Sequence, residues 1–171
     1  VDNRLIKNMV EQLNLLAGKM GFPPDQDRDL VYGCLLRDIG LIGQSDELMV
    51  APSEMTPEQL QVYYQHPERG SDLLKNHDLP QTIIEVISCH HERFNGQGYP
   101  EGLAGREIPL TARIVTVVEN YVAMIMGIGL EKCMSPEEAG QELRDDVEGR
   151  FDPDIVTVFL QAVLSEEPVL V

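Results

Sequence analysis

Apolar residues recur at steps of three and four along much of this chain, which is the period of helices with one buried face. The first such stripe comprises Leu5, Ile6, Met9, Val10, Leu13, Leu16 and Met20. Gly21 and the prolines that follow it end this helix, because neither residue type continues a helix easily. A second helix is predicted from about Pro24 to Leu36.

Capping motifs and prolines mark the later helix starts. In TPEQ (56–59) and SPEE (135–138), a hydroxyl residue is followed three positions later by Gln or Glu, with proline at the first helical position. Asp152 before Pro153 is a similar cap for a last helix through Leu164. The other predicted helices cover approximately residues 67–76, 80–91 and 110–126.

Two segments rich in glycine and proline, 39–55 and 96–109, are predicted to be irregular. No strand-like alternation extends beyond a few residues, and no internal repeat is present. The sequence therefore predicts one all-α domain over residues 1–171, with about seven or eight helices. Because the chain starts at Val rather than Met, we expect it to be a domain cut from a longer protein.

The charge balance narrows the possible functions. The chain has 13 Lys and Arg against 29 Asp and Glu, for a formal net charge of −16. No cluster of positive residues is present, so we expect no binding of DNA or RNA. The same charge opposes a polyanionic ligand unless a metal ion or local cations offset it.

Hydropathy and cysteine usage indicate a cytoplasmic protein. No apolar run approaches the length of a membrane span, so we expect no membrane partner. The three cysteines, Cys34, Cys89 and Cys133, are odd in number and far apart, which disfavours a disulfide framework. Each has apolar neighbours, and we expect each to be a small buried residue.

Histidines and a carboxylate mark the candidate chemistry. His90 and His91 are adjacent, at the end of one predicted helix and before a glycine-rich loop. His66 is expected to close an earlier helix, and Asp38 to close another. Imidazoles and carboxylates that converge from several elements are the ligands that divalent transition metals prefer. This pattern is compatible with a metal or catalytic site, although a lone histidine on a helix, such as His77, is more often a surface residue or a buried structural one.

The order of these residues resembles the HD-GYP domain. The resemblance rests on RDIG (37–40), QHPERG (65–70), SCHHERFNGQGYPEGL (88–103) and IPLTARIV (108–115), and it extends to FDP (151–153). It implies an all-helical fold of the HD phosphohydrolase superfamily. Active members hydrolyse cyclic di-GMP at a centre of two or three metal ions, usually iron or manganese. They often follow a receiver domain in bacterial response regulators.

The resemblance also implies a ligand set. The aspartate of the family's His-Asp pair falls on Asp38, and the family's three later histidine ligands fall on His66, His90 and His91. A later aspartate ligand falls on Glu119, a longer carboxylate that could still coordinate. If the site is active, Asp38 is the candidate catalytic residue.

Other positions depart from the family pattern. The histidine of the His-Asp pair is replaced by Arg37, and a nearby lysine by Leu41. A basic segment that lies near substrate phosphates in the family falls on IGLE (128–131), which ends in Glu131. The signature Gly98-Tyr99-Pro100 is intact.

Arg37 changes what the site is expected to hold. A guanidinium is permanently charged and has no lone pair for a metal. We therefore expect at most one iron or manganese ion, held by Asp38, His66 and His90, or no ion at all. Alternatively, Arg37 occupies the site without metal and pairs with Asp38 or Glu119.

Three functions remain open at the level of sequence. The first is a regulatory module with little or no hydrolysis, which contacts a partner such as a diguanylate cyclase domain through the 98–100 loop; Tyr99 could equally pack under that loop. The second is a residually active, metal-dependent cyclic di-GMP phosphodiesterase. The third is a sensor that binds a cyclic nucleotide without cleaving it, with Arg93, Arg106 and Arg113 as compensating cations. Arg113 could instead pair with a helix-end carboxylate.

Overall fold

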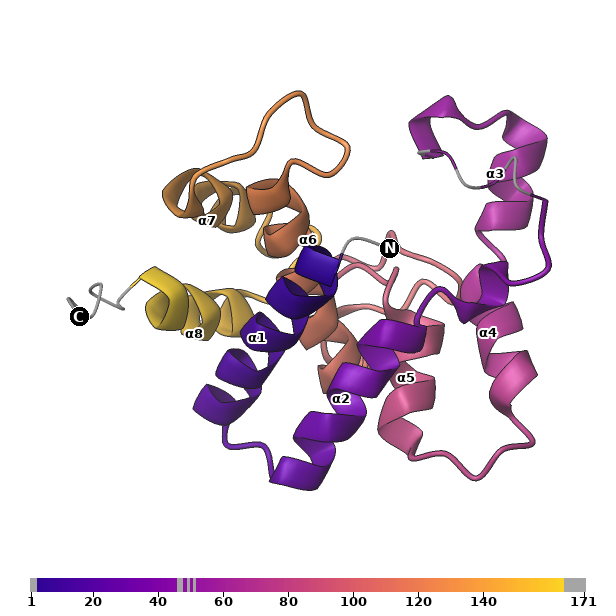
Figure 1. Cartoon of the computed structure of the whole chain (residues 1–171), viewed down its shortest axis with the longest axis horizontal. Coiled ribbons are helices and arrows are strands. Elements are labelled where there is room, and N and C mark those ends of the chain that lie inside the picture. The colour runs from indigo at the N-terminus through magenta and orange to yellow at the C-terminus, as the bar shows by residue number, and fades with distance from the viewer. Residues whose placement is uncertain (1–2, 46–47, 49, 51, 165–171) are drawn as a thin grey trace.

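Helices account for all regular structure in the computed structural model, which describes residues 3–45, 48, 50 and 52–164 (Figure 1). Over these residues there are eight α-helices: α1 (Asn3–Met20), α2 (Pro24–Leu36), α3 (Pro57–Tyr63), α4 (His66–Leu74), α5 (Gln81–Cys89), α6 (Leu110–Met126), α7 (Pro136–Asp145) and α8 (Pro153–Leu164). Short 3-10 turns include η1 (Ile39–Leu41), and the only β pairing in the described part consists of isolated bridges. The all-α prediction is confirmed.

The predicted capping signals operate as expected. Thr56 and Ser135 each accept a hydrogen bond from the backbone N–H three residues later, and the side chain of that later residue accepts from the cap's own N–H. Asp152 accepts from the backbone N–H of Asp154 at 2.8 Å, which caps α8. Two helices end slightly earlier than predicted, at Leu74 and Cys89.

Two sequence-based expectations were wrong. His66 does not close a helix but begins α4, because the proline that follows it is favoured in the first turn, where no backbone N–H is needed. Cys133 is exposed, in the connection between α6 and α7, whereas Cys34 and Cys89 are buried as expected. Residues 46, 47, 49 and 51 of the predicted 39–55 loop, and both ends of the predicted domain 1–171, lie outside the described residues.

Helix α6 lies at the centre of the molecule, and its sequence explains why (Figure 1). It is apolar on most of its surface, and its buried positions are Thr111, Ala112, Ile114, Val115, Thr116, Val117, Val118, Tyr121 and Val122. The apolar stripe of α1 packs against α2, α6 and α8. Helix α5 packs between α2 and α4 and against α6. The C-terminal end of α5, the start of α4 and the middle of α6 are thereby brought into one region.

Two glycines allow the elements around this region to approach closely. A Cβ atom on Gly40 would collide with the carbonyl oxygen of His66, so only glycine lets η1 lie against the start of α4. A Cβ on Gly33 would lie 2.8 Å from the Cβ of Val86, so α2 and α5 are equally close. These contacts place Asp38, between α2 and η1, beside the first residue of α4.

None of the helices over the described ranges has both the length and the apolarity that a bilayer crossing requires.

Candidate functional site

Four side chains from three parts of the fold meet at one point. Asp38 follows α2, His66 begins α4, and His90 and His91 follow the last residue of α5. Each residue offers one potential metal-ligating atom, and these four atoms all lie within 4.8 Å of one another. The structure therefore brings together four of the residues that the sequence analysis named as candidate ligands.

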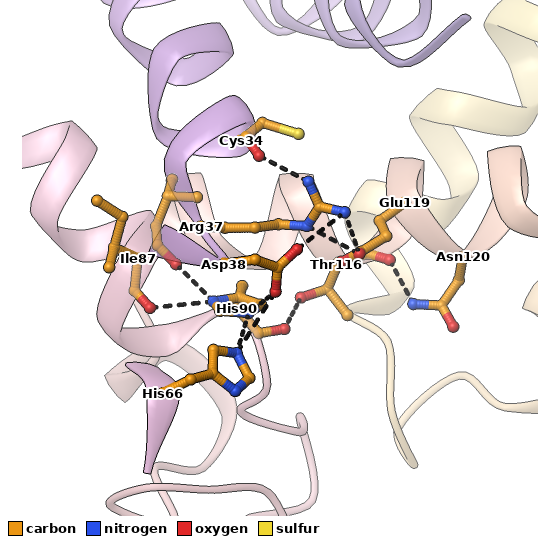
Figure 2. A network of polar contacts seen from close by, with 10 residues as sticks. Cys34, Arg37, Asp38, His66, Ile87, His90, Thr116, Glu119 and Asn120 are labelled. Carbon is orange, nitrogen blue, oxygen red and sulfur yellow. Dashed lines mark hydrogen bonds and ion pairs between the residues drawn. The ribbon is translucent and has the colours of Figure 1, made fainter. Parts of the chain in front are cut away.

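The two buried histidines have their rings oriented by backbone carbonyls. The Nδ1 atom of His66 donates to the carbonyl oxygen of Tyr63 at 2.7 Å. The Nδ1 atom of His90 donates to the carbonyl oxygen of Ile87 at 3.0 Å (Figure 2). Because each imidazole uses its Nδ1 proton in this way, each Nε2 carries a free lone pair. These Nε2 atoms lie only 3.1 Å apart, and Oδ1 of Asp38 lies 3.5 Å from that of His66.

Burial keeps these imidazoles neutral. It lowers the pKa of His66, and the neighbouring His90 lowers it further. Burial also lowers the pKa of His90. A proton shared between the two Nε2 atoms would make one ring an imidazolium, which the lowered pKa values oppose. Two lone pairs facing each other across 3.1 Å are therefore left without a proton between them.

His91 also has a ring nitrogen whose hydrogen-bonding capacity is unsatisfied. Its Nε2 atom is buried and has no hydrogen-bond partner. Its ring stacks on Tyr99 with centroids 4.6 Å apart, and Tyr99 in turn contacts Tyr64 at 4.7 Å. Burial lowers the pKa of His91, so this ring is also neutral and can act as a lone-pair donor.

These residues fit a divalent transition-metal ion. Neutral imidazole nitrogens and one carboxylate are the donor set that iron, manganese or zinc accepts in proteins. A cation among Asp38, His66 and His90 would satisfy the two opposed lone pairs, and backbone carbonyls already orient both rings as metal-binding histidines require. The unpartnered nitrogen of His91 is a further candidate ligand.

Arg37 binds the carboxylate of Glu119. Its Nε and Nη2 atoms lie 2.9 and 2.8 Å from Oε1 of Glu119, and its Nη1 atom donates to the carbonyl oxygen of Cys34 at 2.7 Å (Figure 2). Nη2 also lies 3.5 Å from Oδ2 of Asp38. Arg37 thus contacts both carboxylates that the sequence analysis named as its possible partners.

The Arg37 side chain is only 16% exposed, so its charge needs these partners. Burial opposes the charge, but the carboxylates of Glu119 and Asp38 outweigh it and raise the pKa of the guanidinium above its ordinary value. Glu119 does not belong to the group of converging ligand atoms within the described residues. It neutralises Arg37 instead of completing the expected ligand set.

A cavity of about 730 Å³ opens beside the histidines. Its lining includes His90, His91, Tyr99 and Glu119, together with Arg93 and Arg150. Tyr99 is partly buried over His91, so the expectation that it packs under its loop is supported. Gly98 is required there because a Cβ atom would collide with the backbone N of Arg93.

Glu92 holds the loop in place, and sequence reasoning missed it. Its buried carboxylate accepts hydrogen bonds from the backbone N–H groups of Glu101, Gly102 and Leu103 at 2.8 to 3.1 Å. A glutamate directly after two candidate ligands and before a glycine-rich loop was the available signal. The role of Glu92 could not be predicted without knowing that the loop folds back onto its carboxylate.

Leu41 and residues 128–131, which also differ from the family pattern, lie away from the cavity. Leu41 is partly buried in η1, and residues 128–130 and Glu131 are exposed; none of them lines the cavity as far as the described residues extend. Arg113 pairs with Asp152, as one alternative expected. Arg106 is 80% exposed and pairs with Asp154 at 3.2 Å. Of the three arginines considered as compensating cations, only Arg93 reaches the cavity.

Comparison with protein families identifies the fold. The model of the HD domain family matches residues 2–155, and this chain therefore belongs to the HD domain family. The predicted HD-type helical fold is confirmed.

Curated relatives share this region with the chain. A cyclic di-GMP phosphodiesterase of Thermotoga maritima is 32% identical over 85% of this chain and 40% of its own length. The cyclic di-GMP phosphodiesterase response regulator RpfG of Xanthomonas campestris pv. campestris is 29% identical over 91% of this chain and 42% of its own length. The chain thus spans about two fifths of the length of these relatives.

A solved structure has the same arrangement of helices. An HDG"Y"P protein from Bdellovibrio bacteriovorus superposes with a TM-score of 0.74 at 24% identity, over 94% of this chain and 52% of that one. At this identity the match supports the fold alone.

Proposed function

We propose that this HD domain is an HD-GYP-type module of cyclic di-GMP signalling that holds one divalent metal ion and hydrolyses its ligand weakly or not at all. The ion would be held by Asp38, His66 and His90, with His91 beside them. The observation that carries this proposal is the ion pair of Arg37 with Glu119, which fixes a permanent cation next to the ligand cluster.

The pair limits the site to one ion on electrostatic grounds. A second divalent ion near Glu119 would have to compete with Arg37 for the same carboxylate oxygen. Displacing Arg37 would leave a largely buried guanidinium without its main partner, which costs several kcal/mol. Keeping Arg37 in place would put two like charges close together. Both routes disfavour a second ion.

One ion still supplies useful chemistry, since a bound divalent metal polarises a phosphoryl oxygen and lowers the pKa of a bound water. The chain's own residues contribute the rest. Asp38 provides the negative charge of the ligand set, and the carbonyls of Tyr63 and Ile87 keep the Nε2 lone pairs of His66 and His90 directed at the same point. Clamping both the attacking and the leaving oxygen takes two ions.

A second candidate is a residually active cyclic di-GMP phosphodiesterase. It is favoured by the intact cluster of three histidines and one aspartate beside a cavity of about 730 Å³. The curated relatives named for this activity make it a direct alternative.

Two measurements on the purified chain separate the candidates. We expect elemental analysis after loading with Fe²⁺ or Mn²⁺ to find no more than one ion per chain; two or more would contradict the single-ion proposal. We expect turnover of cyclic di-GMP, with metal supplied, to stay well below about one per second, a typical lower limit for enzymes. Faster steady turnover would establish the phosphodiesterase instead.

A module with weak hydrolysis would act through a partner, and we propose a diguanylate cyclase domain. Tyr99 packs inward against His91, so Pro100 and Glu101, which are exposed, are the part of the loop that would meet a partner. Calorimetric titration of a purified diguanylate cyclase domain tests this. Binding should weaken in Glu101→Lys and stay unchanged in Glu58→Lys, which alters an exposed residue of α3. Equal binding by both variants would rule out this loop as the contact.

A further inference from the structure

Two arginines lie on the wall of the cavity next to the histidine cluster. Arg93 follows directly after His91 and Glu92, and Arg150 comes from the segment before α8. Backbone hydrogen bonds join the two segments: the N–H of Phe94 donates to the carbonyl oxygen of Arg150 at 3.2 Å, and that of Asn95 donates to Gly149 at 2.9 Å. The fold thus places these two cationic residues on neighbouring loop segments that are joined by backbone hydrogen bonds.

The guanidinium of Arg150 is held on two sides. Its Nη1 donates to Oδ1 of Asn120 at 2.7 Å, and the amide nitrogen of Asn120 donates to the carbonyl oxygen of Thr116 at 2.8 Å. On its other edge, Nε lies 3.5 Å from Oδ2 of Asp146. Nη2 has no hydrogen-bond partner among the described residues. The side chain is therefore oriented by α6 with one amino group left for a ligand.

Arg93 has even less to neutralise it. Within the described part of the chain its guanidinium makes no hydrogen bond and no ion pair, although 29 acidic residues are present in the sequence. The two carboxylates that line the cavity are already engaged, Glu92 by loop N–H groups and Glu119 by Arg37. Burial lowers the pKa of Arg150, and the nearby charge of Arg93 lowers it further.

Two like charges on one cavity wall destabilise the folded chain unless an anion neutralises them. In a chain of net charge −16, a partner carboxylate would be easy to supply. Arg150 has such a partner in Asp146 at 3.5 Å, but Arg93 has none among the described residues, which is expected where the ligand itself brings the negative charge. Arginine suits such a role because its planar donors match the oxygens of a phosphate group.

From these observations we infer that Arg93 and Arg150 form an anion subsite that binds a phosphodiester group of a cyclic dinucleotide in this cavity. This inference rests on the proposed function for the identity of the ligand. The subsite itself rests on the two arginines and on the Asn120 side chain that orients one of them. It supplies positive charge that Leu41 and residues 128–131 do not.

Binding measurements on the full metal-free chain, in the presence of a chelator, test the subsite apart from metal and hydrolysis. Cyclic di-GMP and inorganic phosphate are titrated separately. We expect Arg93→Gln and Arg150→Gln each to weaken cyclic di-GMP binding about tenfold, as loss of one charge-assisted hydrogen bond does. The double variant should also lose most of the salt dependence of binding, since screening acts on these charges. Arg106→Gln, which alters an exposed arginine outside the cavity, should bind like the original chain.

Stability measurements separate a ligand role from a structural one. Because Arg93 has no partner among the described residues and repels Arg150, we expect Arg93→Gln to leave the unligated chain as stable or more stable in urea while its affinity falls. If Arg93 instead had a structural role, the Arg93→Gln variant would be less stable in urea and would keep its affinity. If Arg150→Gln does not fold, Arg93→Gln still decides the matter.

The outcomes distinguish the subsite from the proposed function. Arginine variants that bind both probes as tightly as the original chain would overturn the subsite, and so would an original chain that binds neither. Phosphate binding that depends on both arginines, without cyclic di-GMP binding, would uphold the anion subsite and overturn the cyclic di-GMP assignment.

Discussion

Arg37 contacts a single oxygen of Glu119 twice: its Nε donates a hydrogen bond at 2.9 Å, and its Nη2 forms an ion pair at 2.8 Å. The two residues are 82 positions apart in sequence, at the end of α2 and in the middle of α6. Because Arg37 also lies 3.5 Å from Asp38, one guanidinium neutralises two carboxylates at the edge of the histidine cluster. We expect the permanent charge at this point to limit how many metal ions the site accepts.

Replacing Arg37 tests that conclusion directly. In Arg37→His we expect the metal content to rise above one ion per chain, since Glu119 loses its partner and a neutral imidazole can act as a ligand. Hydrolysis of cyclic di-GMP should recover less than metal binding does, because Leu41 and residues 128–131 still supply no phosphate-binding cation. Elemental analysis and turnover are the measurements.

The matched control for this change is Arg28→His, which alters an exposed arginine of α2 that pairs with the neighbouring Asp29. Its metal content should equal that of the original chain. A folded Arg37→His variant that still binds no additional metal would refute the role assigned to Arg37.

The two buried histidines should carry most of the metal affinity. Removing either Nε2 in His66→Ala or His90→Ala takes away a ligand, so Mn²⁺ should no longer raise the melting temperature. In the original chain, Mn²⁺ at about 100 times its Kd should add about 2.7 kcal/mol of stability. Scanning calorimetry with and without Mn²⁺ measures the difference. His77→Ala, which changes an exposed histidine of the α4–α5 connection, should respond like the original chain.

The pH dependence of stability follows from the direction of the histidine pKa shifts. Burial lowers the pKa of His66 and His90 in the folded state, so the unfolded chain binds more protons below the ordinary histidine value of about 6.5. Their contribution to the stability of the metal-free chain is therefore present above that value and is lost as the pH falls toward the lowered pKa. Each group contributes at most about 1.4 kcal/mol per pH unit in that window.

Urea unfolding of the metal-free chain between pH 7 and pH 5 measures this effect. His66→Asn should reduce the slope of unfolding free energy against pH relative to the original chain. Identical slopes in the two chains would mean that His66 is not held neutral by burial.

Glu92 should be needed for the order of the signature loop. Glu92→Gln replaces a carboxylate that accepts three backbone N–H groups with an amide that bears one acceptor oxygen. We expect a loss of about 2 kcal/mol in the free energy of unfolding. Hydrogen exchange at the amides of residues 101–103 should accelerate more than exchange in α6. Glu101→Gln, at an exposed position, should leave exchange and stability close to those of the original chain.

The positions of most helices were predictable because their signals are local. The capping motifs at 56–59 and 135–138 act through hydrogen bonds within one turn, and proline excludes certain backbone conformations wherever it occurs. The same reasoning was wrong for His66, because a residue before proline can start a helix as well as end one. Exposure of Cys133 was missed because apolar neighbours along the chain do not ensure burial in a connection.

Sequence alone indicated the all-α class and, through the family resemblance, a candidate ligand set of Asp38, His66, His90, His91 and Glu119, of which the structure brings the first four together. Tertiary structure alone decided that Arg37 pairs with Glu119, that the Nε2 atoms of His66 and His90 face each other, and that Arg150 lies beside Arg93. The physical reason is that helix formation depends on hydrogen bonds and side-chain spacing within a few residues. Pairing of charges and orientation of rings depend instead on how distant helices pack, and on which carbonyls and carboxylates that packing brings within reach.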